Sequence, residues 1–108
     1  MISLLVLDSV DSTQNEVANR LKAGVPVDAI LAYEQTQGRG RFGRQWHSPK
    51  GGCLALSFAW HAAIDTEWLE GVALAAGVIA AEVFDTSIAW PNDLLINGKK
   101  VGGILCEI

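Results

Sequence analysis

The segment PNDLLINGKKVGGILCEI contains two short apolar runs joined by the dipeptide Asn97-Gly98. Asparagine and glycine tolerate the positive φ angles that a two-residue hairpin turn requires, and this dipeptide between apolar runs is the strongest short hairpin signal in a sequence. The chain is therefore predicted to contain an antiparallel strand pair in its last twenty residues.

The remaining elements follow from apolar periodicity and from helix-capping residues. Three short apolar runs predict strands, at residues 2–8, 29–35 and 52–60. A helix is predicted from the polar cluster Asp11, Ser12 and Thr13, with Thr13 and Glu16 at capping-box spacing, to Gly24. A second helix is predicted from Thr66 to about Phe84, and because it is apolar nearly all round, we expect it to be buried against the sheet. The order β-α-β-β-α-β-β predicts an α+β fold, with a mixed, largely antiparallel sheet and helices packed on one side.

Composition narrows the class of protein further. The chain has 108 residues, of which 50% are hydrophobic and 19% charged, so we expect one globular domain spanning residues 1–108. It has neither an apolar run of about 20 residues nor a signal-peptide pattern, which favours a cytoplasmic protein with no membrane partner. Cys53 and Cys106 lie in apolar runs and are expected to be small buried hydrophobic residues. A net charge of −4 argues against a general nucleic-acid binder.

The positive charge is nevertheless concentrated in one loop, QTQGRGRFGRQWHSP. Glycines let the backbone approach a ligand closely, and the three arginines between them carry planar, permanently charged groups suited to carboxylate and phosphate. No P-loop or Rossmann glycine pattern is present. Taken alone, the composition of the loop favours a solvated basic turn, and an arginine-glycine RNA contact is a lesser alternative.

A second polar group lies around the predicted hairpin. Asn92 offers a donor and an acceptor, Asp93 is a candidate Mg²⁺ ligand, and Lys100 could reach an anion. Turn formation and solvent exposure are the alternative explanations for these residues. Trp46 could stack on a purine or fill the core, and His47 has no partner at a recognisable catalytic spacing.

Three segments in this order, DSTQNEVA, GRGRFGRQWHSPKGGCLALS and WPNDLLINGKKVGGILCE, resemble the biotin protein ligase family. The resemblance covers nearly the whole chain, from Asp8 to Glu107. It implies the class II synthetase-like catalytic domain of biotin and lipoate ligases. It also implies that MgATP activates biotin to biotinyl-5′-AMP, from which biotin passes to a lysine of a carboxylase's biotin carboxyl carrier domain. Both reactants of the first step are anions, so charge neutralisation and positioning lower its barrier.

The resemblance also implies residue roles, which fall into a biotin set and an ATP set. Biotin and its reacting carboxylate would be met by Ser12, Thr13, Gln35, Gly38, Arg39, Arg41 and Lys100. ATP would be met by Arg41, Arg44, Trp46, Asn92 and Asp93, with Asp93 also facing Mg²⁺. Catalysis would rest on Arg39, Arg41 and Lys100, and the arginine loop would belong to a lid that orders over the ligand.

The sequence departs from the family pattern in two respects. Ala89 stands where family members usually have a lysine before Trp-Pro-Asn-Asp. The chain is also expected to be the N-terminal part of the catalytic domain, without the winged-helix DNA-binding domain and the C-terminal barrel-like domain, so DNA is not an expected partner. Because it stops at Ile108 in an apolar run, another strand is expected beside it, which a homodimer would supply. The alternatives are a non-catalytic fragment that binds biotin or biotinyl-AMP, and a lipoate-ligase relative.

Overall fold

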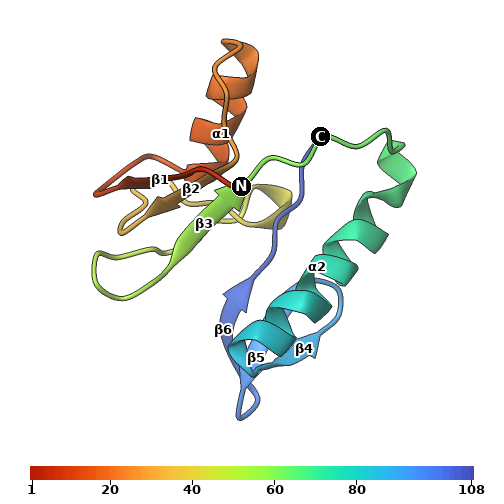
Figure 1. Cartoon of the computed structure of the whole chain (residues 1–108). Helices are drawn as coiled ribbons and strands as arrows, with labels where there is room; N and C mark the ends of the chain where they lie inside the picture. Colours follow the sequence, from red (N-terminus) through yellow and green to blue (C-terminus); the bar gives the residue numbers. More distant parts are fainter. The chain divides into compact units, whose positions relative to one another are not determined.

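Two of the short apolar runs pair as parallel strands, and a third pairs with them in the opposite direction. The computed structural model describes residues 1–108 and has two compact units, of which the first is Met1–His61. In this unit, β1 (Leu4–Leu7) runs parallel to β2 (Ala29–Ala32). β3 (Ala55–Phe58) pairs antiparallel with β2, which is the central strand (Figure 1). All three predicted strands are confirmed, each shorter than predicted.

Helix α1 (Thr13–Lys22) packs on β2 and β3. Val17 of the helix and Ile30 of β2 are buried in this layer. The N-cap is Ser12, whose Oγ accepts a hydrogen bond from the Asn15 N–H, so the predicted Thr13–Glu16 capping box is wrong by one residue. The helix ends as predicted before Gly24, which has a φ of +69°.

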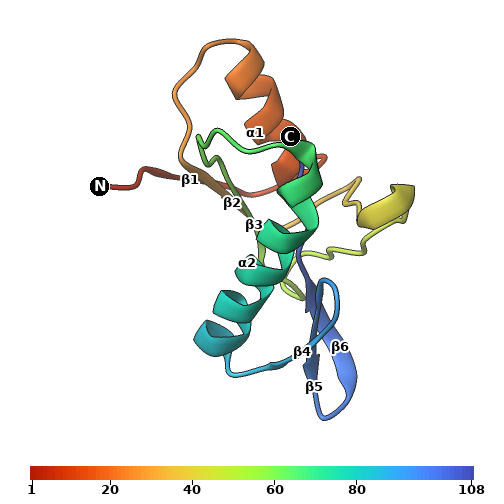
Figure 2. The same cartoon turned by 90° about the vertical axis from the view of Figure 1, so that its right-hand side faces the viewer.

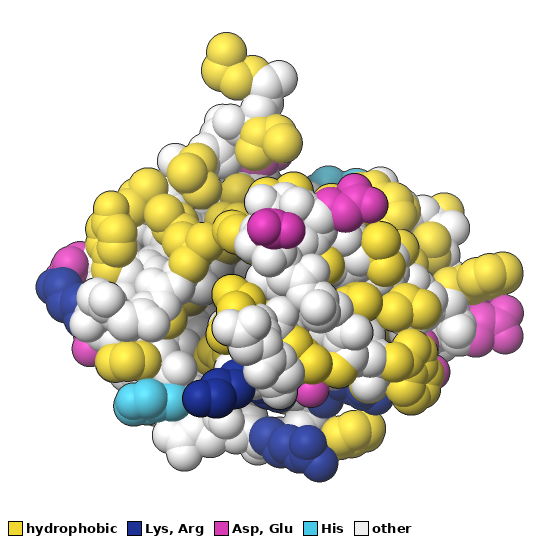
Figure 3. All heavy atoms as spheres, turned by 90° about the horizontal axis from the view of Figure 1, so that it is seen from below, with side chains coloured by type: hydrophobic (Ala, Val, Ile, Leu, Met, Phe, Trp, Pro, Cys, Tyr) yellow, Lys and Arg dark blue, Asp and Glu magenta, His cyan; other side chains and the backbone are white.

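Side chains alternate between more and less exposed positions along the two edge strands, β1 and β3, whereas those of the central strand β2 are largely buried. Ile30 and Ser57 are buried and directly opposite one another in the β2–β3 register. Leu4, Val6, Leu56 and Phe58, at alternating positions of β1 and β3, are exposed. Figure 3 shows hydrophobic side chains over much of the face that it draws.

The second unit, Ala62–Ile108, pairs a helix with an antiparallel sheet. The 3₁₀ turn η2 (Thr66–Trp68) leads into α2 (Leu69–Phe84). The strands β4 (Ser87–Ala89), β5 (Asp93–Ile96) and β6 (Lys99–Gly103) pair in that order, all antiparallel. The predicted hairpin is confirmed, since Asn97 and Gly98 join β5 to β6 with φ angles of +51° and +75°. The predicted single sheet is instead two three-stranded sheets, and β4 is a strand more than the predicted order contained.

Helix α2 packs on β4 and β5 by one side only (Figure 1, Figure 2). Gly77 and Ala81 are its buried residues, whereas Ile79 and Val83 are more than half exposed. The prediction that this helix packs against a sheet is confirmed, but its apolar residues are buried on one side only, because a single sheet face covers one side of a helix. No helix is both long and apolar enough to cross a membrane.

Cys53 and Cys106 are free thiols, as the absence of a disulfide pattern predicted. Both are half-buried rather than fully buried, which corrects the prediction for their packing. Burial of the Cys106 thiol raises its pKa above the ordinary thiol value, because desolvation disfavours the thiolate.

Candidate functional site

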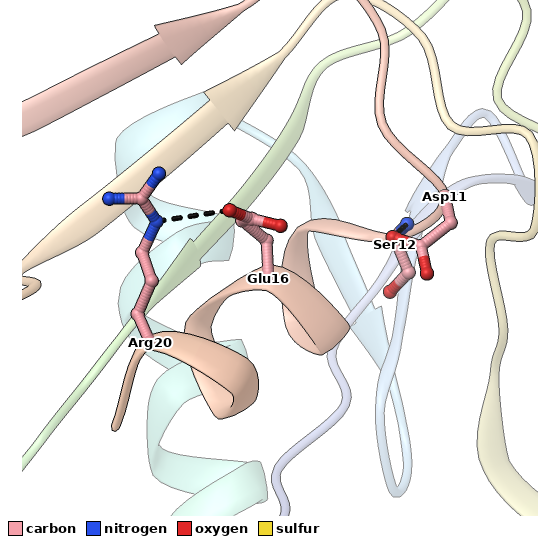
Figure 4. Close-up of polar contacts among 4 residues, drawn as sticks. All are labelled: Asp11, Ser12, Glu16 and Arg20. Atoms are coloured by element: carbon pink, nitrogen blue, oxygen red, sulfur yellow. Dashed lines mark hydrogen bonds and ion pairs between the residues drawn. The ribbon is translucent and has the colours of Figure 1, made fainter. Parts of the chain in front are cut away.

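The N-terminus of α1 carries two buried hydroxyl groups. Ser12 and Thr13 are 1% and 3% exposed. The chain enters the helix through Asp11, whose carboxylate accepts a hydrogen bond from the Ser12 N–H at 2.6 Å (Figure 4). The same helix carries the Glu16–Arg20 ion pair one turn further on, where the two side chains face each other (Figure 4). Local capping and a short i,i+4 pair thus fix the first two turns of α1.

Gln35 joins this helix to the arginine loop. Its Oε1 accepts from the Thr13 N–H at 2.8 Å and from Thr13 Oγ1 at 3.1 Å. Its Nε2 donates to Ser48 Oγ at 3.0 Å. The backbone of Gln35 also bridges Val10 on one side and Ser48 on the other. Since the amide uses both its oxygen and its nitrogen, its orientation is fixed by its neighbours.

Thr13 belongs to a wider group of buried polar side chains. Its Oγ1 lies 2.8 Å from Ser57 Oγ on β3, and Ser57 Oγ lies 2.8 Å from Gln14 Oε1. Three contacts join these side chains: Thr13 Oγ1 with Gln35, Thr13 Oγ1 with Ser57, and Ser57 Oγ with Gln14. The two hydroxyl groups supply only two protons for these three contacts. The group is therefore rich in acceptors and suited to a ligand that donates N–H groups.

Gly38 begins the arginine loop at a place with no room for a side chain. A Cβ at this position would lie 2.6 Å from the Trp46 carbonyl oxygen and 2.9 Å from Gln35 Nε2. The Gly38 carbonyl accepts from the Trp46 N–H at 2.8 Å, which closes the base of the loop. Glycine is needed here for close approach of two backbone segments.

Above this base the loop is a narrow turn. Gly40 N–H donates to the Arg44 carbonyl at 2.7 Å, and the tip is a 3₁₀ turn, η1 (Arg41–Gly43). Phe42 at the tip is 83% exposed and has a φ of +59°. The base of the loop is thus tied to α1 and β2, whereas its tip faces solvent.

The three arginines lie in different surroundings. Arg39 Nη1 donates to Ser12 Oγ at 3.3 Å and to Asn15 Oδ1 on α1. The Arg41 guanidinium lies 4.8 Å from the centroid of the Phe42 ring. Arg44 is exposed. The dense charge of the sequence is therefore divided, with Arg39 at the helix and the other two arginines toward the tip.

Lys50, which follows the loop, pairs with Asp8 at 2.7 Å. The hydrogen bond that Lys50 donates to Asp8 and the attraction of the Asp8 carboxylate raise the pKa of Lys50, so this lysine stays charged while joining the end of the loop to the end of β1. Its charge is matched within the first unit.

The remaining predicted site residues lie in the second unit. Asn92 Nδ2 donates to the Ile104 carbonyl at 3.0 Å, and the Ile104 N–H donates to the Asn92 carbonyl at 2.9 Å. Asp93 Oδ1 forms an ion pair with Lys100 Nζ at 3.0 Å. Asn92 therefore fixes the segment after β6, and Asp93 holds the lysine.

The ion pair lies on one face of the β5–β6 hairpin, whose register contains a β-bulge. The turn aligns Leu95 with Lys100, and the register then shifts so that Asp93 is opposite Gly103. Side chains alternate along a strand, so Asp93, Leu95 and Lys100 share a face. Ala89 of β4 is also opposite Asp93, so a lysine at position 89 would be a direct cross-strand neighbour of the same carboxylate.

No three His, Cys, Asp or Glu side chains are grouped so that they could hold a metal ion. Magnesium commonly takes one or two carboxylates and completes its shell with substrate phosphates and water. Asp93, with its half-buried carboxylate, fits that manner of binding and would have to exchange Lys100 for the ion.

Polar side chains that were not predicted as site residues also take part in these contacts. Asn15 and Gln14 lie on α1, Ser48 follows the arginine loop, and Ser57 is on β3. Ser57 carried a signal, since it is the one polar residue in the run ALSF. Asn15 carried none, because its partner Arg39 is 24 positions away in the sequence.

The chain matches the family described as "Biotin/lipoate A/B protein ligase family" over residues 6–108. It is a member of this family. It is 37% identical to the bifunctional ligase/repressor BirA of Escherichia coli (strain K12), over 98% of this chain and 35% of that protein. It is 41% identical to the biotin–[acetyl-CoA-carboxylase] ligase of Paracoccus denitrificans, over 94% of this chain and 45% of that ligase. The chain thus spans less than half of the length of these relatives.

Solved structures of the family share the fold. The biotin acetyl coenzyme A carboxylase synthetase of Helicobacter pylori with bound biotinylated ATP matches with a TM-score of 0.84 and 28% identity. The match covers 100% of this chain and 56% of that one. The biotin protein ligase of Aquifex aeolicus in complex with biotin and ATP matches with a TM-score of 0.70 and 35% identity, over 100% of this chain and 47% of that one. The resemblance and the α+β fold class are therefore confirmed.

Proposed function

We propose that this chain carries out biotin–protein ligation, activating biotin with MgATP and transferring it to a lysine of a biotin carboxyl carrier domain. A carboxylate oxygen of biotin attacks the α-phosphorus of ATP, the bond from that phosphorus to the bridging oxygen breaks, and pyrophosphate leaves. The carrier lysine then attacks the acyl carbon of biotinyl-5′-AMP, and AMP leaves as the amine loses a proton.

The observation that carries the proposal is the group around the N-terminus of α1. Ser12, Thr13, Gln35, Gly38 and Arg39, five of the seven residues expected at biotin, lie together in the first unit. The acceptor-rich part of this group suits the ureido N–H donors of biotin. Arg39 beside it supplies a cation for the carboxylate. The complexes of relatives with biotin, ATP and biotinylated ATP support the same substrates.

The roles of the other residues follow from charge. Arg41 would join Arg39 at the carboxylate and α-phosphate, and Arg44 would meet ATP phosphates. Lys100 would hold the reacting carboxylate or phosphate oxygen after leaving Asp93. These cations oppose the repulsion between two anions without a covalent enzyme nucleophile.

The nucleotide would be placed by Trp46, lying against adenine, and by Asn92. Magnesium would neutralise phosphate charge, and Asp93 would hold it together with phosphate and water oxygens. Asn92 is already fixed by its bonds with Ile104, so its position would not depend on the nucleotide.

Binding without transfer is a second candidate, favoured by Ala89. A small residue stands opposite Asp93, where the family usually supplies a cation beside the triphosphate. Loss of that cation would weaken nucleotide binding more than biotin binding, because biotin carries one charge and MgATP several.

Pyrophosphate release by the purified chain separates the two candidates. With biotin and MgATP, a ligase releases pyrophosphate in proportion to added biotin, whereas reactions without biotin stay at background. No release together with calorimetric binding of biotin would support the non-catalytic candidate, and absence of both would contradict the proposal. Competition of lipoate against biotin in the same titration tests the lipoate alternative.

A further inference from the structure

Two polar residues at the start of α1 control where Arg39 lies. Asn15 Oδ1 accepts from Arg39 Nη1, and Asn15 Nδ2 donates to Asp11 Oδ2 at 3.2 Å. The other Asp11 oxygen accepts from the Ser12 N–H. We infer that Asp11 and Asn15 are positioning residues, which hold the Arg39 guanidinium against the N-terminus of α1 before any substrate is bound. The consequence for catalysis rests on the proposed function.

The direction of the Asn15 amide follows from its neighbours. A carboxylate can only accept hydrogen bonds and a guanidinium can only donate them. Asn15 lies between one of each, so its NH₂ group must face Asp11 and its oxygen must face Arg39. Asp11 therefore acts on Arg39 through Asn15, by keeping the acceptor end of the amide turned toward the guanidinium.

The helix itself does not attract Arg39. The N-terminus of an α-helix carries partial positive charge and favours anions. A guanidinium at this end is held by the acceptors Ser12 Oγ and Asn15 Oδ1, since charge-assisted hydrogen bonds are stronger than neutral ones. Without Asn15, we expect Arg39 to move away from the helix and from the Ser12 and Thr13 hydroxyls.

This placement fixes one cation, Arg39, where a carboxylate would arrive. The guanidinium lies beside the hydroxyls expected to contact biotin. A preorganised cation need not be reoriented when the reacting anion binds, and catalysis gains from donors that are already in place. Asp11 and Asn15, which we call the relay, thus support the adenylation step by holding Arg39 and do not themselves contact the substrate.

Exchanging the hydrogen-bond donor and acceptor between positions 11 and 15 tests the positioning role. In Asn15→Ala the Asn15 acceptor for Arg39 is lost while Ser12 Oγ remains, and in Asp11→Asn the Asn15 amide is free to turn its NH₂ group toward Arg39. The double variant Asp11→Asn with Asn15→Asp reverses donor and acceptor, because the amide introduced at position 11 would donate to the carboxylate introduced at position 15. That carboxylate would in turn accept from Arg39. The double variant also keeps the net charge of the chain and the acceptor for the Ser12 N–H.

We expect biotin-dependent pyrophosphate release to fall roughly ten- to hundredfold in each single variant, with the loss mainly in kcat, because a small misplacement of a reacting group has effects of that size. The double variant is expected to recover to within about threefold of the original chain if polarity is what matters. Glu16→Gln, which breaks only the Glu16–Arg20 pair on the same helix, is the matched control and is expected to keep full activity. A double variant that folds but stays as inactive as the single variants would overturn the inference.

A second measurement does not depend on ligase activity. In ¹⁵N-labelled protein, the guanidinium signals of Arg39, assigned with Arg39→Lys, report whether its N–H groups are held in hydrogen bonds. We expect slowly exchanging signals in the original chain and in the double variant, and their loss in both single variants. If the original chain releases no pyrophosphate, the proposed function fails while these signals still decide the positioning role. Signals that survive in the single variants contradict it.

Discussion

At the scale of single residues, the surroundings of a residue decide its role in the candidate site more than its amino-acid type does. Three arginines stand within six positions of the sequence, yet Arg39 contacts α1 while Arg41 lies over the Phe42 ring and Arg44 is exposed. Glycine is required at position 38 because a backbone carbonyl and an amide side chain occupy the space of a Cβ. Gly40, two positions later, has no atom closer than 3.9 Å to such a Cβ.

Gly38→Ala is therefore expected to weaken both the fold and biotin binding. The added methyl would displace the Trp46 carbonyl or the Gln35 amide, and overpacking of this kind typically costs about 1–3 kcal/mol. Calorimetric titration with biotin and thermal unfolding measure the two effects, with Gly40→Ala as the matched control in the same loop. Equal behaviour of the two variants would show that the Gly38 contact is not restrictive.

Lys100→Ala is expected to slow biotin-dependent pyrophosphate release by about two to three orders of magnitude, the effect of removing one preorganised donor. Its thermal midpoint should change little, since the partly exposed pair with Asp93 stabilises weakly. Lys99→Ala on the same strand serves as the control. A loss confined to transfer onto the carrier, with adenylation unaffected, would contradict the assigned role.

At the scale of elements, local signals predicted what local residues decide. The hairpin turn was predictable because its two positive φ angles fall on Asn97 and Gly98, residue types that adopt such angles readily. The helix cap was misplaced by one residue because three consecutive polar residues can all cap, and the bond from the Asn15 N–H selects Ser12. The division of the strands into two sheets and the one-sided burial of α2 depend on pairings between distant segments. The periodicity of apolar residues gives no information about such pairings.

The candidate site likewise combines features that local motifs predict with features that depend on long-range contacts. Its residues were predicted from the motifs that carry the family resemblance, whereas no motif predicted their contact partners. Thr13 and Gln35 are 22 positions apart, and Thr13 and Ser57 are 44 apart. Contacts at such separations arise only when β2 and β3 pair and α1 packs on them.

Two glycines of α2 give a test of its one-sided packing. A Cβ at Gly71 would meet nothing within 4 Å, so Gly71→Ala is expected to stabilise the chain by about 0.5–1 kcal/mol through helix propensity. A Cβ at Gly77 would lie 2.7 Å from Ile88 Cδ1, so Gly77→Ala should gain less or lose stability as Ile88 moves. Urea unfolding measures which of the two variants is more stable. A Gly77→Ala chain as stable as Gly71→Ala would contradict the packing of α2 on β4.

At the scale of the whole molecule, much of the apolar surface remains exposed. The buried apolar residues number seven, four of them alanines: Val17, Ala29, Ile30, Ala32, Ala55, Ala81 and Leu94. Alanine contributes little area, and buried apolar area is the main stabilising term in folding. Stability is therefore expected to be low for a chain of this length, and small contributions such as ionisation should be measurable.

The Cys106 thiol supplies one such contribution. Its pKa is raised in the folded state, so the folded chain keeps a proton that the unfolded chain releases once pH exceeds the ordinary thiol value of about 8.5. The free energy of unfolding should accordingly fall as pH rises from about 8 to 10. Urea unfolding across this range measures the slope, and Cys106→Ala should show a shallower one. An unchanged slope in that variant would assign the effect to other groups.

The separation of the arginine loop into a tied base and a solvent-facing tip has a practical consequence. Phe42 is exposed at the tip, and its positive φ is a conformation that asparagine and glycine adopt more readily. A fluorophore attached at position 42 would therefore leave the base undisturbed and report on the surroundings of the tip. Position 42 is thus a suitable place for an optical probe of the proposed biotin and ATP binding.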